Sequence, residues 1–267
     1  MKLPRFLLLI PALALSACSI LPDQVTKEST TPFSIVLKNS GVKLALSTTR
    51  DFAKSKESLS IPDDNMLPFQ EYTYSALPSP EILDNEDTPY DYGCSRGPSN
   101  KKEAFYYFKY TFYVKNIGDV TARYIFTINL EENKSEAGKS LNDTLRVMVF
   151  NNDATNPNMS VTHDYSVYAK EAAGNNYDRD GNPTNREFIA YNSIGGYEDE
   201  QHLLAFSFQS DSIAFRHTHE NMVKNDITRY TIVFWLEGED PQSSADAEAP
   251  TGSSINMKID IVATESN

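Results

Sequence analysis

From residue 104 onward, apolar and polar side chains alternate along the chain with a period of two. In 104–116 ("AFYYFKYTFYVKN") the even positions, such as Phe112, are apolar or aromatic, whereas Lys109 and Thr111 fall on the other face. The segment 121–132 ("TARYIFTINLEE") repeats this alternation. Because successive side chains of a strand point to opposite faces, both segments predict strands with one buried and one solvated face.

A short turn signal separates these two predicted strands. The sequence "NIGD" (116–119) contains Gly118, and glycine adopts a positive φ without steric cost. A tight turn between two alternating segments is typical of a β-hairpin. We therefore expect the two strands to pair with each other.

Further short strands are expected along most of the chain. Their predicted positions are 32–38, 41–49, 144–150, 164–170, 186–191, 203–208, 212–217, 227–237 and 254–263. Many short strands, with few amphipathic helix patterns between them, indicate an all-β fold. The predicted architecture is an antiparallel β-sandwich of the immunoglobulin-like or jelly-roll type.

Four of the predicted strands each carry one apolar face and are expected to share a single sandwich core. They are 105–114, 122–131, 227–236 and 255–263. The side chains expected to be buried between them are Phe112, Phe126, Ile232 and Ile259. The C-terminus is thus predicted to be a core strand rather than a loose tail.

Residues 49–103 differ from the rest, because they are rich in Pro, Ser, Asp and Glu and show weak periodicity. An irregular stretch of this length inside a compact domain is uncommon, so it is either a functional appendage or a segment that wraps the sandwich. Its tyrosines favour wrapping, since aromatic rings are costly to leave in water. These are Tyr72, Tyr74, Tyr90 and Tyr92. We expect one domain, 33–267, with 49–103 as an irregular insertion.

The first residues, "MKLPRFLLLIPALALSAC", have the order of an export signal. Lys2 and Arg5 precede an apolar run that is shorter than the about 20 residues needed to span a bilayer. The end of this run, Leu15 to Cys18, resembles a bacterial lipobox, in which the cysteine is acylated and becomes the first residue. The prediction is a lipoprotein signal peptide (1–17), a lipidated Cys18 and a flexible tether (18–32). The alternative is an ordinary cleaved signal with a chance cysteine.

The net charge of the chain limits the kinds of partner that it can bind. With 37 acidic and 24 basic residues, the formal net charge is −13. Such an acidic surface argues against nucleic acid and against anionic lipid head groups, which leaves the acyl chains at Cys18 as the expected membrane contact. If Cys18 is acylated, Cys94 is the one remaining thiol and has no partner for an internal disulfide. We expect Cys94 to be a small, partly buried side chain.

Two stretches carry a resemblance to a known group of proteins. They are "YTFYVKNIGDVTARYIFTINLEE" (110–132) and "MVKNDITRYTIVFWLEGEDPQ" (222–242). Over about 170 residues the chain resembles the sandwich surface proteins of Gram-positive bacteria, nearest to the TasA and camelysin group. The resemblance implies an exported protein of the extracellular matrix, and some members have been called metalloproteases. The lipobox departs from the group and implies a membrane-tethered form.

The clearest chemical motif is "NYDRDGNPTNRE" (176–187), which has the ligand spacing of a calcium loop. The candidate ligands are Asn176, Asp178, Asp180, Asn182 and Glu187. Calcium takes six to eight oxygens, and a glycine such as Gly181 permits the sharp turn between ligands. Asn176 replaces the usual first Asp, and no helix pattern flanks the loop. Calcium is therefore a possible cofactor, and the alternative is a polar hairpin loop.

Two other groups of polar residues are candidate metal ligands. The turn "EGEDPQ" contains Glu237, Glu239 and Asp240, and is expected to be a solvated strand end. In "AFRHTHE", His217 and His219 would share a strand face, with Glu220 following. A transition-metal site would need a third ligand, such as His163 or His202, so two surface histidines are the simpler expectation.

The sequence lacks the common enzyme signatures. The sequence contains no HExxH, GxSxG, P-loop or dinucleotide-binding pattern, so we do not expect an enzyme. The expected function is a lipid-anchored module on the outer face of the cell membrane. It would act structurally, adhesively or in the matrix, by binding surface proteins, glycans or copies of itself. The alternatives are a calcium- or solute-binding lipoprotein, and a surface metalloprotease.

Overall fold

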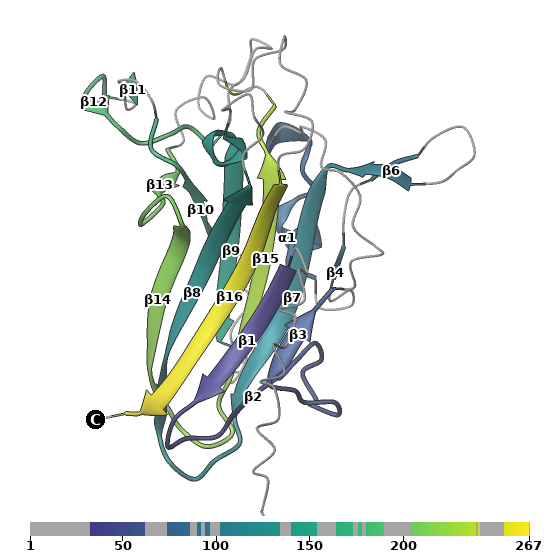
Figure 1. Cartoon of the computed structure of the whole chain (residues 1–267), viewed down its shortest axis with the longest axis vertical. Coiled ribbons are helices and arrows are strands. Elements are labelled where there is room, and N and C mark those ends of the chain that lie inside the picture. Colours follow the sequence, from purple (N-terminus) through teal and green to yellow (C-terminus); the bar gives the residue numbers. More distant parts are fainter. Residues whose placement is uncertain are drawn as a thin grey trace, which may run out of the picture.

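The computed structural model describes twelve stretches of the chain, and together they form a two-sheet β-sandwich (Figure 1). They are residues 33–61, 74–85, 90–91, 94–96, 102–133, 140–153, 164–172, 176–177, 180–189, 204–238, 240 and 254–266. The predicted signal peptide, the tether and Cys18 lie outside them. Within them, no helix has the length and apolar composition needed to cross a bilayer.

The first sheet has five strands and lies in front in Figure 1. In spatial order they are β14 (Ile213–Met222), β8 (Ala122–Asn133), β16 (Ser254–Glu265), β1 (Phe33–Asn39) and β3 (Ser58–Ser60). The C-terminal strand β16 is central, between β8 and β1. β16 runs antiparallel to β8 but parallel to β1, with Ile35 beside Ile259.

The second sheet has seven strands. In order they are β13 (Phe206–Ser207), β10 (Tyr165–Ala169), β9 (Leu145–Asp153), β15 (Ile227–Leu236), β7 (Tyr107–Asn116) and β2 (Leu44–Ser47), and β4 (Tyr90–Asp91) also pairs with β7. Two small hairpins lie apart from the sheets, namely β5 (Cys94–Arg96) with β6 (Lys102–Phe105), and β11 (Asn176–Tyr177) with β12 (Pro183–Thr184). The short helices are η2 (Tyr74–Ala76), α1 (Pro80–Leu83) and η3 (Leu141–Asp143).

The core between the sheets confirms the predicted all-β sandwich and its four central side chains. Phe112, Phe126, Ile232 and Ile259 are all fully buried. Two of them come from each sheet, and aromatic rings fill the space between them. The rings of Phe126 and Tyr230 stack with centroids 4.6 Å apart. Two β-strand pairs, β1 with β16 and β10 with β13, are parallel, a feature that alternation cannot reveal because it is the same for both directions.

The predicted hairpin at residues 116–119 is wrong. β7 belongs to the seven-stranded sheet and β8 to the five-stranded sheet, so the turn carries the chain from one layer to the other. Asn116 holds this crossing, because its side-chain amide donates to the carbonyls of Val120 (2.9 Å) and Met222 (2.8 Å). Gly118 does not adopt a positive φ. A Cβ there would lie 3.2 Å from the backbone nitrogen of Lys43, so a larger residue would fit tightly.

The second face of the seven-stranded sheet is also buried, which corrects the expectation of a solvated face at Lys109 and Thr111. Each of these two residues is only 1% exposed. A second apolar cluster, which includes Leu83, Met148 and Trp235, lies on this side of the sheet. The described part of 74–85 therefore forms a third layer over β7 and β15.

Polar contacts join this third layer to the sheet. The Asp84 carboxylate forms a buried ion pair with Arg229 and accepts a hydrogen bond from the Thr231 hydroxyl (2.8 Å). Lys109 donates from Nζ to the carbonyl of Asn85 (2.7 Å). Buried charges are tolerated where they are paired in this way. The lysine that alternation assigned to solvent is thus buried with a backbone partner.

Most described parts of the irregular insertion pack on the sandwich, whereas β5 pairs with β6 in a separate hairpin. β3 extends the first sheet and β4 the second. The Tyr74 ring lies 6.0 Å from the Trp235 ring, whereas Tyr90 is 54% exposed. Tyr72 and Tyr92 lie outside the described residues. Wrapping is therefore the arrangement of 49–61, 74–85 and 90–91, but not of the β5–β6 hairpin.

Several predicted strands differ in length from the observed elements, and 41–49 is shortened to β2. The described part of 186–191 contributes only an isolated bridge between Phe188 and Leu204, and the described part of 203–208 contains β13 as its one strand. The segment 212–217 extends to Met222 as β14. Cys94 lies in β5, and its side chain is outside the described set.

Candidate functional site

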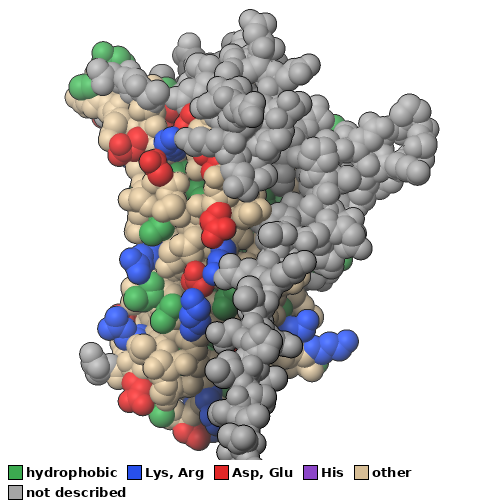
Figure 2. All heavy atoms as spheres, in the orientation of Figure 1, with side chains coloured by type: hydrophobic (Ala, Val, Ile, Leu, Met, Phe, Trp, Pro, Cys, Tyr) green, Lys and Arg blue, Asp and Glu red, His purple; other side chains and the backbone are tan. Residues whose placement is uncertain are grey.

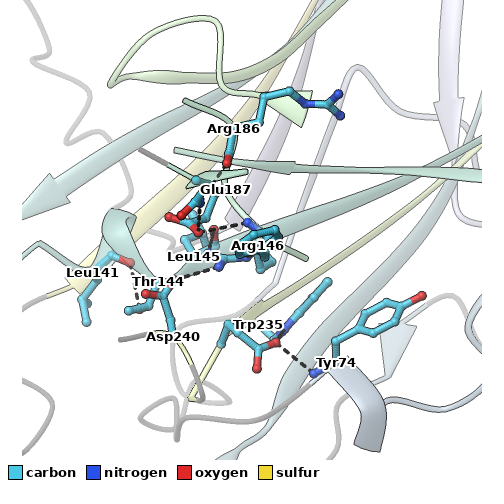
Figure 3. Close-up of polar contacts among 12 residues, drawn as sticks. Tyr74, Leu141, Thr144, Leu145, Arg146, Arg186, Glu187, Trp235 and Asp240 are labelled. Carbon is cyan, nitrogen blue, oxygen red and sulfur yellow. Dashed lines mark hydrogen bonds and ion pairs between the residues drawn. The ribbon is translucent and has the colours of Figure 1, made fainter. Parts of the chain in front are cut away.

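A buried arginine organises one end of the sandwich (Figure 3). Arg146 lies near the start of β9, and its side chain is fully buried. Its Nε donates to the Phe188 carbonyl (3.0 Å), and its terminal nitrogen forms an ion pair with Asp240 (2.7 Å). The Asp240 side chain is also fully buried. Arg146 therefore ties two segments that are far apart in the sequence to the same strand end.

Glu237, directly after β15, makes a second polar contact at this end. One carboxylate oxygen accepts hydrogen bonds from the Trp235 indole nitrogen and from the Tyr74 backbone nitrogen, both at 2.9 Å (Figure 3). Glu237 thereby fastens the covering segment to the end of the strand. The expectation of a solvated strand end at "EGEDPQ" is wrong for Glu237 and Asp240, which are 0% and 2% exposed. Glu239 is outside the described residues.

The calcium-like motif forms the small hairpin β11–β12, in which Asn176 pairs with Thr184. Gly181 adopts a φ of +80° at its tip, the conformation that the motif requires of its glycine. Asp180 and Asn182 are exposed near this tip. Asp178 belongs to the part of the chain that is not described.

The first and last residues of the motif come together below the hairpin. Asn176 donates from its side-chain amide to a Glu187 carboxylate oxygen (3.3 Å), which also accepts from the Phe188 backbone nitrogen (2.9 Å). Glu187 is only 2% exposed, whereas a solvated loop would leave it in water. The described side chains include no group of three or more His, Cys, Asp or Glu placed to hold a metal ion. Calcium binding stays a prediction.

Arg186 anchors the base of the same hairpin. Its guanidinium donates to the carbonyls of Ala205 (2.8 Å) and Leu204 (2.9 Å) and lies 5.0 Å from the centre of the Phe206 ring. The hairpin is therefore held against β13 at the edge of the seven-stranded sheet. In Figure 1 it projects beyond the end of the sandwich.

The chemistry of this cluster is that of a clamp. Asp240, Glu187 and Glu237 each accept at least one hydrogen bond from a protein donor. Buried carboxylates that accept such hydrogen bonds fix the segments that supply the donors. The segments gathered here are Tyr74, Phe188 and the turn at Asp240. Both acidic motifs noticed in the sequence thus converge on one end of the sandwich through Arg146.

The two histidines of β14 share a face, as expected, but they are partly buried rather than on the surface. His217 lies opposite Phe126 and His219 opposite Tyr124, on the core side of the sheet. The His219 ring stacks on Tyr124 at 5.0 Å. Burial lowers the pKa of His217. Glu220 points to the outer face, and His163 and His202 are outside the described residues.

Arg146 and Asp84 were not identified from the sequence. Each of them belongs to an ion pair that is almost completely buried. Arg146 interrupts the apolar run "TLRVMVF", and a charge within such a run is a signal for a buried partner. Asp84 had no comparable signal, because it lies in the irregular insertion. Its partner Arg229 is 145 positions away in the sequence.

Comparisons of the chain with models of known protein families, with curated proteins and with solved structures found no match.

Proposed function

We propose that the protein is a surface lipoprotein, tethered to the outer face of the cell membrane, whose β-sandwich acts as a structural, adhesive or matrix-associated binding module. The single observation that carries the proposal is the Leu15-Ser16-Ala17-Cys18 box directly after the apolar run. A diacylated or triacylated Cys18 would anchor the chain, and 18–32 would link the anchor to β1. A 15-residue link reaches at most about 50 Å, which keeps the module near the membrane.

The architecture is compatible with a load-bearing or adhesive role. The seven-stranded sheet is buried on both faces, and an ion pair and hydrogen bonds fix the covering layer to it. The five-stranded sheet has one outer face, where the described basic, acidic and apolar side chains are interspersed (Figure 2). Two ion pairs on this face are Lys38 with Asp260 (3.3 Å) and Arg123 with Glu220 (4.0 Å). A mixed surface of this kind suits contact with another protein or a glycan better than contact with a polyanion.

Mass spectrometry of the mature N-terminus tests the anchor. We expect an acylated Cys18 as the first residue, and we expect Cys18→Ala to give an uncleaved or released chain. Cys94→Ala is the matched control, because it removes the other cysteine and should leave the lipid in place. An unmodified mature start at another residue would refute the lipoprotein.

Calcium binding at the β11–β12 hairpin is the second candidate function. The observation in its favour is that positions 1 and 12 of the motif, Asn176 and Glu187, contact each other. Extracellular calcium modules bind at about 10⁻⁴ to 10⁻³ M, so millimolar calcium would raise the unfolding free energy by roughly 1 kcal/mol.

A thermal melt with calcium and with chelator decides this second candidate. We expect a rise of a few degrees with calcium for the wild type and no rise for Asp180→Ala. Asp164→Ala, at an exposed carboxylate outside the motif, should behave like the wild type. Equal melting temperatures of the wild type in both buffers would make the loop an ordinary polar hairpin.

A further inference from the structure

The longest sheet edge in the described part of the molecule is β14. It has ten residues and pairs on one side with β8, while its other side lies at the margin of the molecule in Figure 1. The other edge strands of the two large sheets, β3, β13, β2 and β4, have three, two, four and two residues. A long edge presents a row of backbone donors and acceptors to any strand that lies beside it. Its side chains then determine which strand fits.

The side chains of β14 divide cleanly between the two faces of the sheet. Arg216, Thr218 and Glu220 are exposed on the outer face. Phe215 and the two histidines face the core side, opposite Ile128, Phe126 and Tyr124 of β8. From Phe215 to His219 the pairing with β8 is regular, and irregularities lie on either side of this stretch. The centre of β14 therefore has regular β-strand geometry, and a further strand could pair with it there.

Symmetry restricts how two copies of this edge can meet. A two-fold axis perpendicular to the sheet pairs β14 with itself antiparallel and keeps the outer faces on the same side. Residues that lie directly opposite each other share a face of the sheet, so their positions in β14 differ by an even number. The two-fold axis therefore lies beside one residue, which faces its own copy, and not between two consecutive residues. With the axis at Thr218, Arg216 of one copy lies opposite Glu220 of the other, and the reverse pair forms as well. Thr218 then faces its own copy.

The neighbouring registers lack this match. An axis at His217 places Arg216 opposite Thr218, and an axis at His219 places Arg216 opposite Met222. Opposite charges and Thr–Thr pairs directly across two strands are stabilising, and like charges are not. In the Thr218 register, Glu220 would lie between its own Arg123, 4.0 Å away, and Arg216 of the second copy. Charges on an edge ordinarily prevent pairing, but here they are complementary to themselves.

We propose that a second copy of this chain pairs with β14, antiparallel and with the two-fold axis at Thr218. The two five-stranded sheets then become one ten-stranded sheet across the dimer. This inference rests on the proposed function as a surface module and names its partner as the same protein. Two copies on one membrane face meet at high local concentration, which favours a modest interface.

Disulfide cross-linking of the full chain in its own membrane tests the register. Thr218→Cys should give a disulfide-linked dimer on mild oxidation, because opposite Cα atoms in an antiparallel pair are about 4.5 or 5.5 Å apart. Lys258→Cys is the matched control, since it lies on the same face but in the central strand β16. Neither it nor the wild type should be linked. A monomeric Thr218→Cys chain, or one linked to a different protein, overturns the proposal.

Charge exchange in the Thr218→Cys chain tests the complementarity. Arg216→Glu alone and Glu220→Arg alone each replace two attractive pairs with two repulsive ones, so the cross-linked fraction should fall about tenfold. The double exchange should restore it, and so should co-expression of the two single variants, which complement each other. Equal linking in all four cases overturns the register. A monomer that still carries the lipid on Cys18 would refute this inference alone, whereas an unlipidated chain would refute the proposed function.

Discussion

At the scale of single residues, the strongest constraint on the fold is that buried charges need their partners. Arg146 and Asp240 are both fully buried, and they form an ion pair of 2.7 Å at that end of the sandwich. Removing one member leaves the other as a desolvated charge, which costs far more than the pair contributes. This large energetic cost is expected for the buried pair and not for exposed ion pairs such as Lys224 with Asp119.

We expect Asp240→Ala to lower the free energy of unfolding by about 3 to 5 kcal/mol, because Arg146 remains buried without its carboxylate. Urea unfolding followed by tryptophan fluorescence measures this, since Trp235 is fully buried. Arg146→Met together with Asp240→Leu should lose less than Asp240→Ala alone. Asp119→Ala is the control, with little expected effect. A mild Asp240→Ala phenotype would contradict the clamp.

His217 predicts a pH dependence of stability. Burial lowers its folded-state pKa below the ordinary value of about 6.5, so the unfolded chain takes up a proton more readily. The free energy of unfolding should therefore decrease as the pH falls from about 6.5 to the lower pKa of the folded state, and His217 should cause no further decrease below that pKa. The neighbouring groups are the rings of Phe126 and Phe215 and the imidazole of His219.

The measurement for His217 is the midpoint of chemical unfolding at several pH values between 7.5 and 5. His217→Gln should flatten this part of the pH profile, because it removes the titrating group. An NMR titration of the His217 ring should show a midpoint below that of a free histidine. A midpoint above it would mean that burial is not the dominant influence.

At the scale of elements, the segment 74–85 turns a two-layer sandwich into three layers. It covers β7 and β15 with Leu83 and is fixed by Asp84 and by the backbone of Asn85. Without it, the buried face that contains Lys109, Met148 and Trp235 would meet water. The segment is therefore part of the fold and not a surface loop.

Asp84→Ala should detach this layer. The variant loses the ion pair with Arg229 and the hydrogen bond from Thr231, so amide hydrogen exchange in 74–85 and β15 should become faster. Exchange in β8 and β16, on the other sheet, should change much less. The exposed carboxylate variant Asp164→Ala is the control. Uniform acceleration across both sheets would show that the layer has no separate stability.

Prediction from the sequence succeeded for some elements and failed for others, for physical reasons. Alternation identified β8 and β16, because each has one face in the core and one in solvent. It misassigned the outer faces of β7 and β15, because a segment with no periodicity of its own covers them. It also mistook the 116–119 crossing for a hairpin, since a turn between strands looks the same whether the strands share a sheet or not.

The candidate site shows the same limit. The spacing of 176–187 correctly marked a turn with a positive-φ glycine, because that conformation is local. The convergence of Glu187, Asp240 and Arg146 depends on contacts across more than 40 positions of sequence, which no local pattern encodes. Only the charge within "TLRVMVF" pointed to a buried partner.

At the scale of the whole molecule, the C-terminal strand holds the first sheet together. β16 pairs with β8 along twelve residues and with β1 along seven. A chain that ends at residue 253 would lack β16 and its pairing with both β8 and β1. The core side chains that pack against Met257 and Ile259 would then be exposed to water. We expect such a truncation to abolish cooperative unfolding in circular dichroism.

The control for the truncation is a chain that ends at residue 265, which keeps all of β16 and should unfold like the full protein. A cooperative transition in the chain ending at residue 253 would contradict the role of β16. Secretion of that shorter chain in a folded, protease-resistant form would do the same.

The parallel pairing of β1 with β16 also sets an order of events during biosynthesis. Phe33 cannot pair with Met257 until the ribosome has added Met257, more than two hundred residues later. Contacts between such distant positions form slowly, and β1 has no complete place in the sheet until the last strand has emerged. If the chain is exported as proposed, this delay helps its passage through a translocation channel, because the first sheet stays incomplete until β16 has been made.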